Sequence, residues 1–549
     1  MEQIYHIYYT YFLAVSRWLL PLFGLIFTCQ WIRCLMALRY QPVSLGALVS
    51  PEGKRFPLTA HESSVGGGST ADVAIPSLNR RRKCAVIVKK DEWYIYKTLA
   101  SQEVKLNGQP IDRVSQLEFG DILQFGDTEY KFMPPSAGDC KQKPKKAQKA
   151  SAGALMFWLI IFQIVMLLQL LLKFYPEIPP GLPIAFLSLF LIELVYFFIR
   201  KAFKDPNILA EMQAFFLVTI GLGICTTAAP ATLIKQAAAV VLGFLGFVAL
   251  WQLLKSPDRA MKLRYIFGGG AVVLLILNLI FGKQIYGARN WIDLGIITFQ
   301  PSEFVKVAFI AAGSAALYRL LATRNAILFM GFSAFLLGCL ALIRDFGGLL
   351  IFFVTMMVII FLRTGDIKTI IAISALAVTG GVALIVIMPH ISSRFKVWRH
   401  VWEYANSTGF QQTRTLTAAA SGGLLGVGGG NGYLDRVAAS DTDLVFGIVC
   451  EEWGLILGLC VLASFILLSF YAFKFARNAK SAYYSIAVCA TAALLLFQAA
   501  LNIFGSTDIL PLTGVTLPFV SNGGTSMVAS FGLLSFFKGC AVNQGGARV

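Results

Sequence analysis

The sequence predicts a polytopic α-helical membrane protein of thirteen spans, with an all-β domain inserted after the first helix. Of its 549 residues, 57% are hydrophobic and only 14% are charged, and the mean hydropathy is +0.69. Soluble domains carry about 25% charged residues, so this composition excludes a soluble enzyme. The net charge is +18. In a soluble protein this excess would indicate nucleic-acid binding. In a membrane protein it is explained by the Lys and Arg of cytoplasmic loops, so we expect no nucleic-acid partner.

Apolar segments long enough to cross a bilayer make up most of the chain. A spanning helix needs about 20 apolar residues, and the first candidate runs from Tyr11 to Leu38. Twelve more follow a Lys-rich stretch, at about 154–173, 181–200, 210–229, 232–254, 263–282, 302–322, 326–343, 347–363, 367–389, 444–473, 482–505 and 524–543. The expected domains are an N-terminal helix (1–42), a β domain (43–135), a basic linker (136–153), two additional helices (154–205) and a helical core (206–549).

The Lys and Arg residues between the spans predict the orientation of the chain, because cytoplasmic loops are enriched in both. Six such loops place their basic residues on one side. Thirteen spans then put the N-terminus outside, and the 43–150 region and the C-terminus in the cytoplasm. The polar gaps 283–301, 390–443 and 506–520 face outward, so we expect the chemistry of the protein on the outer face.

The polar region after the first helix has the pattern of a β-sandwich. Short alternating runs at 85–89, 93–96 and 104–106 are typical of strands, and Asn107-Gly108 is typical of a hairpin turn. Two more strands are expected between 117 and 132.

The runs L-N-G at 106–108 and L-E-F-G-D-I-L-Q-F-G-D at 117–127 make this domain resemble a forkhead-associated (FHA) domain. That family binds phosphothreonine through an Arg and a Ser-Arg-x-His run. Here Gly67 stands in place of the Arg, and Arg81 and Cys84 in place of the Ser and His. The basic run 80–82 is an alternative phosphate site through charge alone, and it is equally typical of a solvated turn near an anionic leaflet.

Charged and amide side chains are rare in this chain, so their clusters point to function. In the first cluster Ser302 follows a proline and predicts a helix start, which places Glu303 and Lys306 on one helical face. The functional interpretation is a polarised pair facing a lipid-headgroup pocket, with Arg289 and Trp291 supplying a phosphate contact and an interfacial ring. The alternative is a local ion pair that neutralises two charges.

Three further clusters lie in or beside the outward gaps. Asp345 opens a span in a run of Arg-Asp-Phe-Gly-Gly. The glycine-rich stretch 421–432 lets backbone approach a ligand closely, and Asp443 precedes a span with two more carboxylates, which indicates function or a structural network. The Pro- and Gly-rich stretch 510–526 predicts a re-entrant loop.

These four clusters, in this order, resemble the motifs of the SEDS family (FtsW, RodA and SpoVE proteins), from about Asn207 to Lys538. The resemblance implies the SEDS fold with ten core spans. It also implies a peptidoglycan glycosyltransferase that polymerises lipid II, an undecaprenyl-pyrophosphate-linked substrate, at the outer face of the bacterial cytoplasmic membrane in cell division, elongation or sporulation. The implied partner is a class B penicillin-binding protein, and the FHA-like domain adds a cytoplasmic protein partner.

The resemblance also implies roles for single residues. Cationic groups or a divalent cation, Mg²⁺ or Mn²⁺, should stabilise the departing pyrophosphate. Two positions depart from the family pattern, with Asp441 in place of a His and Asn522 in place of a Tyr. The residues that the clusters and motifs assign to substrate binding are Arg289, Trp291, Gln300, Ser302, Glu303, Lys306, Asp345, Gln411, Ser521, Gly523, Gly524 and Ser526.

The base that deprotonates the sugar 4-hydroxyl is a carboxylate in this family. Alignment on Gly409-Phe410-Gln411 puts Tyr404 where that Asp is expected. Glu403, the adjacent carboxylate, is the first candidate for the base, with Asp441 and Asp443 as alternatives. Because Tyr is a poor base, with a pKa of about 10, the alternative function is a catalytically silent homologue that binds lipid II or regulates a penicillin-binding protein.

Overall fold

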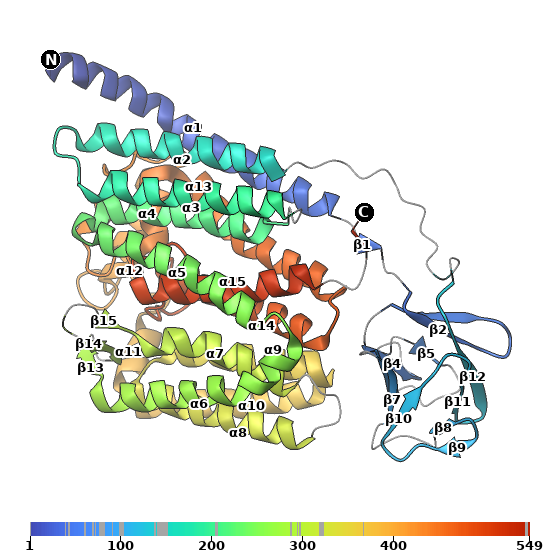
Figure 1. Cartoon of the computed structure of the whole chain (residues 1–549). Helices are drawn as coiled ribbons and strands as arrows, with labels where there is room; N and C mark the ends of the chain where they lie inside the picture. The colour runs from blue at the N-terminus through green and yellow to red at the C-terminus, as the bar shows by residue number, and fades with distance from the viewer. Residues whose placement is uncertain are drawn as a thin grey trace.

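The computed structural model describes residues 2–38, 40–41, 44–59, 62–67, 71, 73–75, 83–89, 92–97, 104–136, 139, 152–203, 207–285, 288–293, 295, 298–317, 323–365, 367–543 and 547–548. It has two parts, a bundle of long helices and a smaller β-rich part beside one end of that bundle (Figure 1). The chain forms α1 in the bundle, then the β-rich part, and returns to the bundle with α2.

The bundle is built from long apolar helices and two shorter ones, α11 and α12. In chain order the helices are α1 (Glu2–Ala37), α2 (Ala152–Phe174), α3 (Gly181–Ala202), α4 (Leu209–Ala228), α5 (Leu233–Leu253), α6 (Pro257–Phe281), α7 (Pro301–Ala316), α8 (Thr323–Ile343), α9 (Phe346–Thr364), α10 (Ile367–Ile387), α11 (Pro389–Val397), α12 (Phe410–Gly422), α13 (Val445–Ala476), α14 (Ala482–Ser506) and α15 (Gly524–Val542).

A helix is present at each of the thirteen predicted spans, but the count of clear spans is lower. Within the described residues, ten helices are long and apolar enough to cross a membrane. The other three are α7, with 16 residues, and α8 and α10, whose described apolar stretches are Ile327–Ile343 and Ile367–Val382. Most of α7 is buried by protein, so other helices and not lipid cover this short helix.

The helices α1 to α3, which precede the expected core, pack against it. α1 lies along α2 and α13, and α3 lies along α5 (Figure 1). The indole N–H of Trp31 on α1 donates to the Leu209 carbonyl at 2.8 Å. The Gln163 amide on α2 donates to Glu193 on α3 at 2.7 Å and to Thr219 on α4 at 2.9 Å. Polar groups inside a membrane are costly unless paired, so these bonds fix the additional helices to the core.

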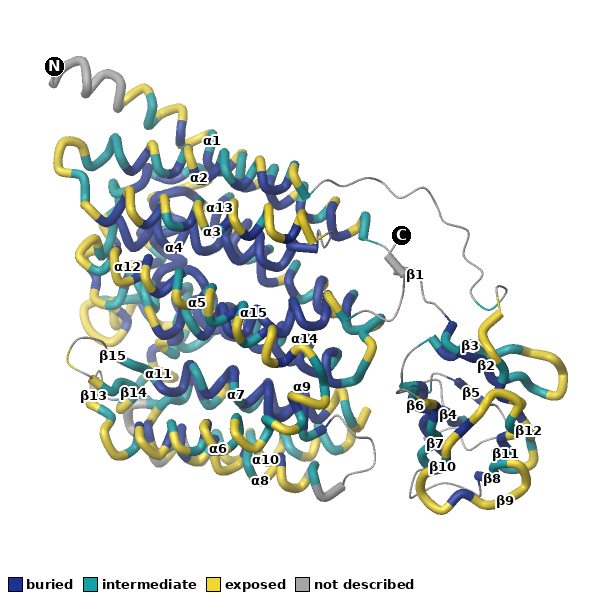
Figure 2. The backbone as a smooth tube through the Cα atoms, in the orientation of Figure 1, coloured by how far each residue is buried: buried dark blue, intermediate teal, exposed yellow. Residues whose placement is uncertain are grey.

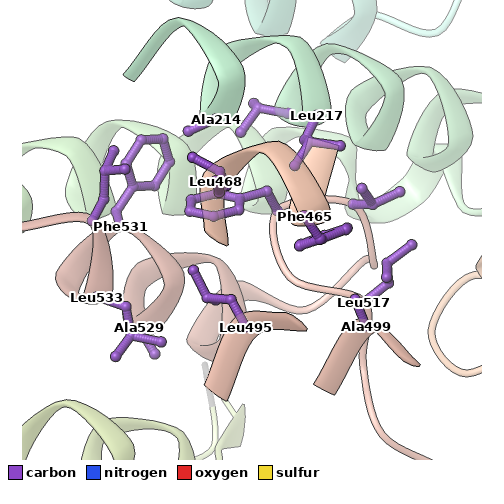
Figure 3. Close-up of a cluster of buried hydrophobic side chains, with 14 of the residues drawn as sticks. Ala214, Leu217, Phe465, Leu468, Leu495, Ala499, Leu517, Ala529, Phe531 and Leu533 are labelled. Carbon is purple, nitrogen blue, oxygen red and sulfur yellow. The ribbon is translucent and has the colours of Figure 1, made fainter. Parts of the chain in front are cut away.

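The centre of the bundle is an apolar core shared by α4, α13, α14 and α15. α4 is buried along its whole described apolar length (Figure 2). Phe465 and Leu468 of α13 lie among side chains of the other three helices, and Leu517, from the loop before α15, joins them (Figure 3). Since lipid is as apolar as Leu, close packing rather than the hydrophobic effect drives such association in a membrane. This core holds the loop 507–523 against the helices.

The backbone of the glycine-rich stretch 421–432 lies close to α13. α13 is broken at Gly454, which has φ 86° and ψ 164°. The N–H of Leu455 then donates to the Gly423 carbonyl at 2.9 Å, and the N–H of Gly428 donates to the Glu452 carbonyl at 2.8 Å. The glycines permit this close approach of two backbones.

The β-rich part is the predicted sandwich. Its strands are β2 (Gly46–Val49), β3 (Arg55–Leu58), β4 (Glu62–Gly66), β5 (Val73–Ala74), β6 (Lys83–Lys89), β7 (Trp93–Lys97), β8 (Val104–Leu106), β9 (Gln109–Pro110), β10 (Val114–Leu117), β11 (Ile122–Phe125) and β12 (Thr128–Met133). One sheet has the order β10-β7-β6-β4-β5 and the other β3-β2-β12-β11-β8-β9. The rings of Trp93 and Phe132, one from each sheet, are 5.1 Å apart in the shared core. A short pair joins β1 (Tyr40–Gln41) to β16 (Ala547–Arg548).

The expected strands and hairpin of the sandwich are confirmed. β6, β7, β8, β11 and β12 fall on the five predicted runs. Asn107 and Gly108 both have positive φ, 49° and 82°, as a two-residue hairpin turn requires. The basic run 80–82 lies outside the described residues. Cys84 is buried in β6, so it does not supply a surface group in place of the FHA His.

Candidate active site

A cavity of about 1680 Å³ opens among α7, α9, α10 and α11 and the loops that precede α13 and α15. The three gaps predicted to share one side of the membrane, 283–301, 390–443 and 506–520, all contribute lining residues. Before α7, the first gap forms a small antiparallel sheet of β13 (Lys283–Ile285), β14 (Ala288–Asp293) and β15 (Thr298–Phe299). The three gaps therefore meet at one cavity, as a common side requires.

Glu303 and Lys306 form an ion pair at the start of α7. The Lys306 Nζ is 2.7 Å from the Glu303 Oε1 and 3.0 Å from the Gln498 Oε1 of α14. The two side chains are only 7% and 4% exposed, and both residues line the cavity. The predicted pair is confirmed. Because removal of one partner would leave a buried charge, this pair holds the inner wall of the cavity in place.

Asp345 caps α9 at the same wall. Its Oδ1 accepts a hydrogen bond from the Gly348 N–H at 2.8 Å, as an N-cap residue does. The Ser302 hydroxyl of α7 donates to the Oδ2 at 3.4 Å, which is a long contact. Burial raises the pKa of Asp345, against the opposing effects of the Gly348 N–H and of the Lys306 charge. Asp345 thus joins the N-terminal ends of α7 and α9.

Asp443 lies immediately before α13 and faces the cavity. Burial raises the pKa of Asp443 to about 6, while a Thr442 hydrogen bond and the positive charge of Arg394 oppose this rise. Arg394 on α11 also lines the cavity, and its Nη1 donates to the Leu512 carbonyl at 2.8 Å. A carboxylate whose pKa lies just below neutral pH is ionised yet basic enough to accept a proton.

The loop before α15 fixes the segment that carries Asp443. Asn522 donates from its side chain to the Asp441 Oδ2 at 2.8 Å, and its backbone N–H donates to the Asp441 carbonyl at 2.9 Å. The Ser521 hydroxyl donates to the Thr442 carbonyl at 2.6 Å. The two departures from the family pattern, Asp441 and Asn522, therefore contact each other at the cavity rim.

The other candidate residues divide into two groups. Those that line the cavity are Trp291, Gln300, Gly523 and Ser526. Those outside its lining are Arg289, Ser302, Gln411, Ser521 and Gly524. Arg289 is exposed on β14, and the Gln411 amide donates to the Ala438 carbonyl at 2.9 Å. Ser521 and Gln411 thus bond to carbonyls of the loop that carries Asp443.

Glu403, the first candidate for the base, lies outside the cavity. Its side chain is 70% exposed and its carboxylate is 3.1 Å from the His400 Nδ1. The segment 399–409 folds into turns that close on themselves, with the Gly409 N–H donating to the Tyr404 carbonyl at 3.0 Å. The structure therefore brings Asp441 and Asp443 to the cavity and leaves Glu403 in solvent.

Arg394 is the cavity residue that the sequence patterns missed. Its signal is a basic residue in a gap assigned to the outer face, where Lys and Arg are less common. Asn522 was noticed only as a departure, although amides are rare in this chain. Arg394 comes close to Asp443, and Asn522 bonds Asp441, only through the folding of distant loops.

A divalent cation was one of two expected ways to stabilise pyrophosphate. In the described part of the chain, no group of three or more His, Cys, Asp and Glu side chains is placed to hold a metal. We therefore derive no step through a metal here. The cationic side chains that line the cavity are Lys306, Arg344 and Arg394.

Comparison with known proteins identifies the helical core. The family model FTSW_RODA_SPOVE, described as Cell cycle protein, matches residues 212–542. The chain belongs to this family. The Buchnera aphidicola protein named "Probable peptidoglycan glycosyltransferase FtsW" is 32% identical to this FtsW/RodA/SpoVE family member over 273 residues, which cover 47% of this chain and 67% of that relative.

Among solved structures, one match covers most of the helical core of this FtsW/RodA/SpoVE family member. A chain described under "Structural coordination of polymerization and crosslinking by a peptidoglycan synthase complex" matches with 27% identity and a TM-score of 0.53, covering 61% of this chain and 97% of that chain. The FHA-like sandwich matches a chain from "Structural and functional analysis of phosphothreonine-dependent FHA domain interactions" with 18% identity and a TM-score of 0.15, covering 18% of this chain and 98% of that chain.

Proposed function

We propose that the protein is a peptidoglycan glycosyltransferase that polymerises lipid II. The observation that carries this proposal is the placement of Asp443 beside Arg394 on the wall of the 1680 Å³ cavity. This arrangement sets a proton acceptor next to a cation, as a transfer with a pyrophosphate leaving group requires. The relative named as a peptidoglycan glycosyltransferase supports the same activity.

In the proposed reaction Asp443 takes the proton of the acceptor sugar 4-hydroxyl. The freed oxygen attacks the anomeric carbon of the donor, and the bond from that carbon to the pyrophosphate oxygen breaks. Arg394, Arg344 and Lys306 on the cavity wall stabilise the negative charge that develops on the leaving pyrophosphate. A single displacement of this kind inverts the anomeric centre.

The cavity also suits the lipid part of such a substrate. Side chains of α8, α9 and α10, including Leu337, Phe353 and Ile373, give it an apolar wall beside the charged one. A polyprenyl chain is apolar and its pyrophosphate is anionic. A cavity with both kinds of wall therefore matches a polyprenyl-pyrophosphate sugar better than a free sugar nucleotide.

We further propose that the cavity opens to the outside of the bacterial cytoplasmic membrane. The Lys- and Arg-rich loops favour a cytoplasmic position for the opposite end of the bundle. In this orientation the FHA-like sandwich and the C-terminus lie in the cytoplasm. The sandwich is then available to a cytoplasmic protein partner.

We propose a class B penicillin-binding protein as the partner of the helical core. The matched solved structure is described as a peptidoglycan synthase complex that coordinates polymerisation and crosslinking. A polymerase that makes uncrosslinked strands needs such a partner to complete the wall.

A second candidate function is a catalytically silent scaffold that holds lipid II or a penicillin-binding protein. The observation that favours it is Tyr404, which stands at the position of the family's expected Asp and is 38% exposed outside the cavity. The scaffold retains the cavity and its lipid-linked ligand but transfers no sugar.

The decisive experiment gives labelled lipid II to the purified full chain, with and without a class B penicillin-binding protein. We expect glycan strands from the wild type. Asp443→Asn should lower the polymerisation rate by about 10²–10⁴-fold, which is the usual effect of losing a general base, while lipid II binding persists.

Two matched substitutions separate the candidate bases. Asp435→Asn removes an exposed acid of the same gap and should leave the rate unchanged. Glu403→Gln should also leave the polymerisation rate unchanged, because Glu403 lies outside the cavity. A rate loss confined to Glu403→Gln would assign the base to Glu403. A wild type that binds lipid II but makes no strands with its partner would establish the scaffold.

A further inference from the structure

A second cavity, of about 270 Å³, lies where the sandwich meets the helical bundle. Its walls come from β4 and β6 of the sandwich and from the connections α5–α6 and α13–α14 of the bundle. In Figure 1 the sandwich lies beside this end of the bundle, with β4 toward the helices. The cavity is therefore built from both parts of the chain. It shares no lining residue with the 1680 Å³ cavity.

Three lysines line this small cavity. Lys89 comes from the end of β6, Lys255 from the connection before α6, and Lys480 from the connection before α14. Lys255 and Lys480 are exposed at the surface of the bundle. Three positive charges around one small volume attract an anion.

Two helix N-termini add to this positive field. α6 begins with Ser256 as its N-cap, and the Ser256 hydroxyl accepts from the Arg259 N–H at 3.3 Å. α14 begins after Ser481, whose side chain makes no capping bond. The Ser481 Oγ is buried and has no hydrogen-bond partner within the described part of the chain. N-terminal N–H groups and the helix dipole both favour a bound anion, and the Ser481 hydroxyl is an unused donor beside them.

Glu62 of β4 is the acidic residue of this lining. Its charge also acts on Arg363 at the end of α9, and within the lining its single negative charge faces three lysines. The lysines and the two helix ends together leave the cavity electropositive.

We propose that this cavity binds a phosphate group, and that the bound phosphate links the sandwich to the helical bundle. Small-molecule pockets usually measure about 300–1,000 Å³, so a volume of 270 Å³ suits a phosphate ion or one phospholipid headgroup. Both sources present the same anionic oxygens to the lysines. The proposal does not depend on glycosyltransferase activity.

This site differs from the phosphothreonine site of FHA domains. In the pairing of β4 with β6, Glu62 lies opposite Val88 at the cavity end, and Gly66 lies opposite Lys83 at the other end. In the sequence the basic run 80–82 directly precedes Lys83, whereas Lys89 of the cavity lies at the other end of β6.

The test is hydrogen–deuterium exchange of the full chain with inorganic phosphate as the probe. We expect slower exchange of the first-turn amides of α14 and of the β6 amides near Lys89. Lys255→Gln with Lys480→Gln should weaken the apparent phosphate affinity at least about tenfold, because two charge-assisted contacts are lost. Glu62→Gln should tighten it. The control, Lys201→Gln with Lys262→Gln, removes two exposed lysines outside the cavity and should change nothing.

A second arm compares phosphatidylcholine vesicles with and without phosphatidylglycerol. Protection by inorganic phosphate assigns the site to a free anion, and protection only by phosphatidylglycerol assigns it to a headgroup. Both results support the proposal. Protection by neither, an equal loss in the control variant, or protection of these amides only by a phosphothreonine peptide would overturn it.

Discussion

The carboxyl group of Asp443 lies between two neighbours of opposite charge. Burial raises its pKa to about 6, the Arg394 charge lowers it, and the Asp441 charge raises it. A Thr442 hydrogen bond also lowers this pKa. Asp443 acts as a base only when ionised. The proposed activity therefore depends on the balance of these four effects, and the pH dependence of the rate measures that balance.

We expect the polymerisation rate to fall as the pH drops below about 6. Asp443 then becomes protonated, and the rate should decrease toward about tenfold per pH unit, as for a single ionisation. Asp441→Asn removes the neighbouring negative charge, so the pKa of Asp443 should decrease and the acid limb should move to lower pH. Initial rates between pH 4 and 8, a range of about four units around this pKa, check both expectations. An acid limb that stays in place in Asp441→Asn would contradict the coupling.

The buried Glu303–Lys306 pair gives a prediction about stability. Lys306→Met keeps most of the side-chain volume but leaves the Glu303 carboxylate without its cation. We expect the free energy of unfolding to decrease by about 3–5 kcal/mol. Unfolding in mixed micelles, followed by tryptophan fluorescence, provides the measurement.

A double substitution serves as the control for this pair. Glu303→Gln with Lys306→Met removes both charges, so most of the lost stability should return. Equal losses in the single and double variants would mean that packing, and not charge, explains the effect.

At the residue scale, local spacing predicted the pairs that lie within one helix. Glu303 and Lys306 are three residues apart, and a helix start at Ser302 was sufficient to place them together. Arg394 and Asp443 are far apart in the sequence, and only the folding of 390–443 onto the loop before α15 brings them to one cavity. Glu403 has the right chemistry, but turns that follow no simple periodicity put it in solvent.

At the scale of elements, α13 shows how a break in a helix positions a loop. Gly454 has φ 86°, and a Cβ there would meet the Leu424 carbonyl oxygen at 2.3 Å. The break frees carbonyls of the first half of α13 to accept from the glycine-rich stretch 421–432. This contact ties the stretch that follows α12 to α13, the helix that Asp443 precedes.

We therefore expect Gly454→Ala to destabilise the fold. The positive φ alone costs about 1–3 kcal/mol for a non-glycine residue, and the backbone overlap adds to this cost. The matched control is Gly246→Ala in α5, where no atom lies within 4 Å of the added Cβ; it should be neutral or slightly stabilising. Unfolding midpoints of the two variants in the same micelles check the prediction. Equal midpoints would mean that α13 tolerates a regular helix here.

The length of the apolar runs predicted well where the helices lie. It predicted less well which helices are long enough to cross a membrane. Helices occur at all thirteen predicted spans, since long apolar runs have few alternatives to a helix in lipid. α7 differs because protein surrounds it, so its polar residues and its 16-residue length are tolerated. The glycines of 421–432 predicted a close backbone approach, but sequence composition alone does not show that α13 lies on one side of this stretch.

For the whole molecule, the distribution of Lys and Arg predicts which connections lie at the same end of the bundle, and the two cavities agree with this grouping. The three gaps expected on one side meet at the 1680 Å³ cavity, and Lys255 and Lys480 meet the sandwich at the small cavity. Which side faces the cytoplasm rests on the positive-inside rule alone. The orientation therefore needs a direct measurement in cells.

Thiol accessibility in intact cells provides that measurement. In a variant whose ten native cysteines are replaced, a single cysteine is introduced at Asn406 or at Gly108, both of which are exposed in the fold. A membrane-impermeant maleimide should label Asn406→Cys and spare Gly108→Cys, because Asn406 belongs to an outward gap and Gly108 to the sandwich. Permeabilised cells should label both, which controls for reactivity. The reverse pattern in intact cells would put the substrate cavity in the cytoplasm. It would also contradict polymerisation at the outer face, since the cavity must open on the side where the glycan strands are made.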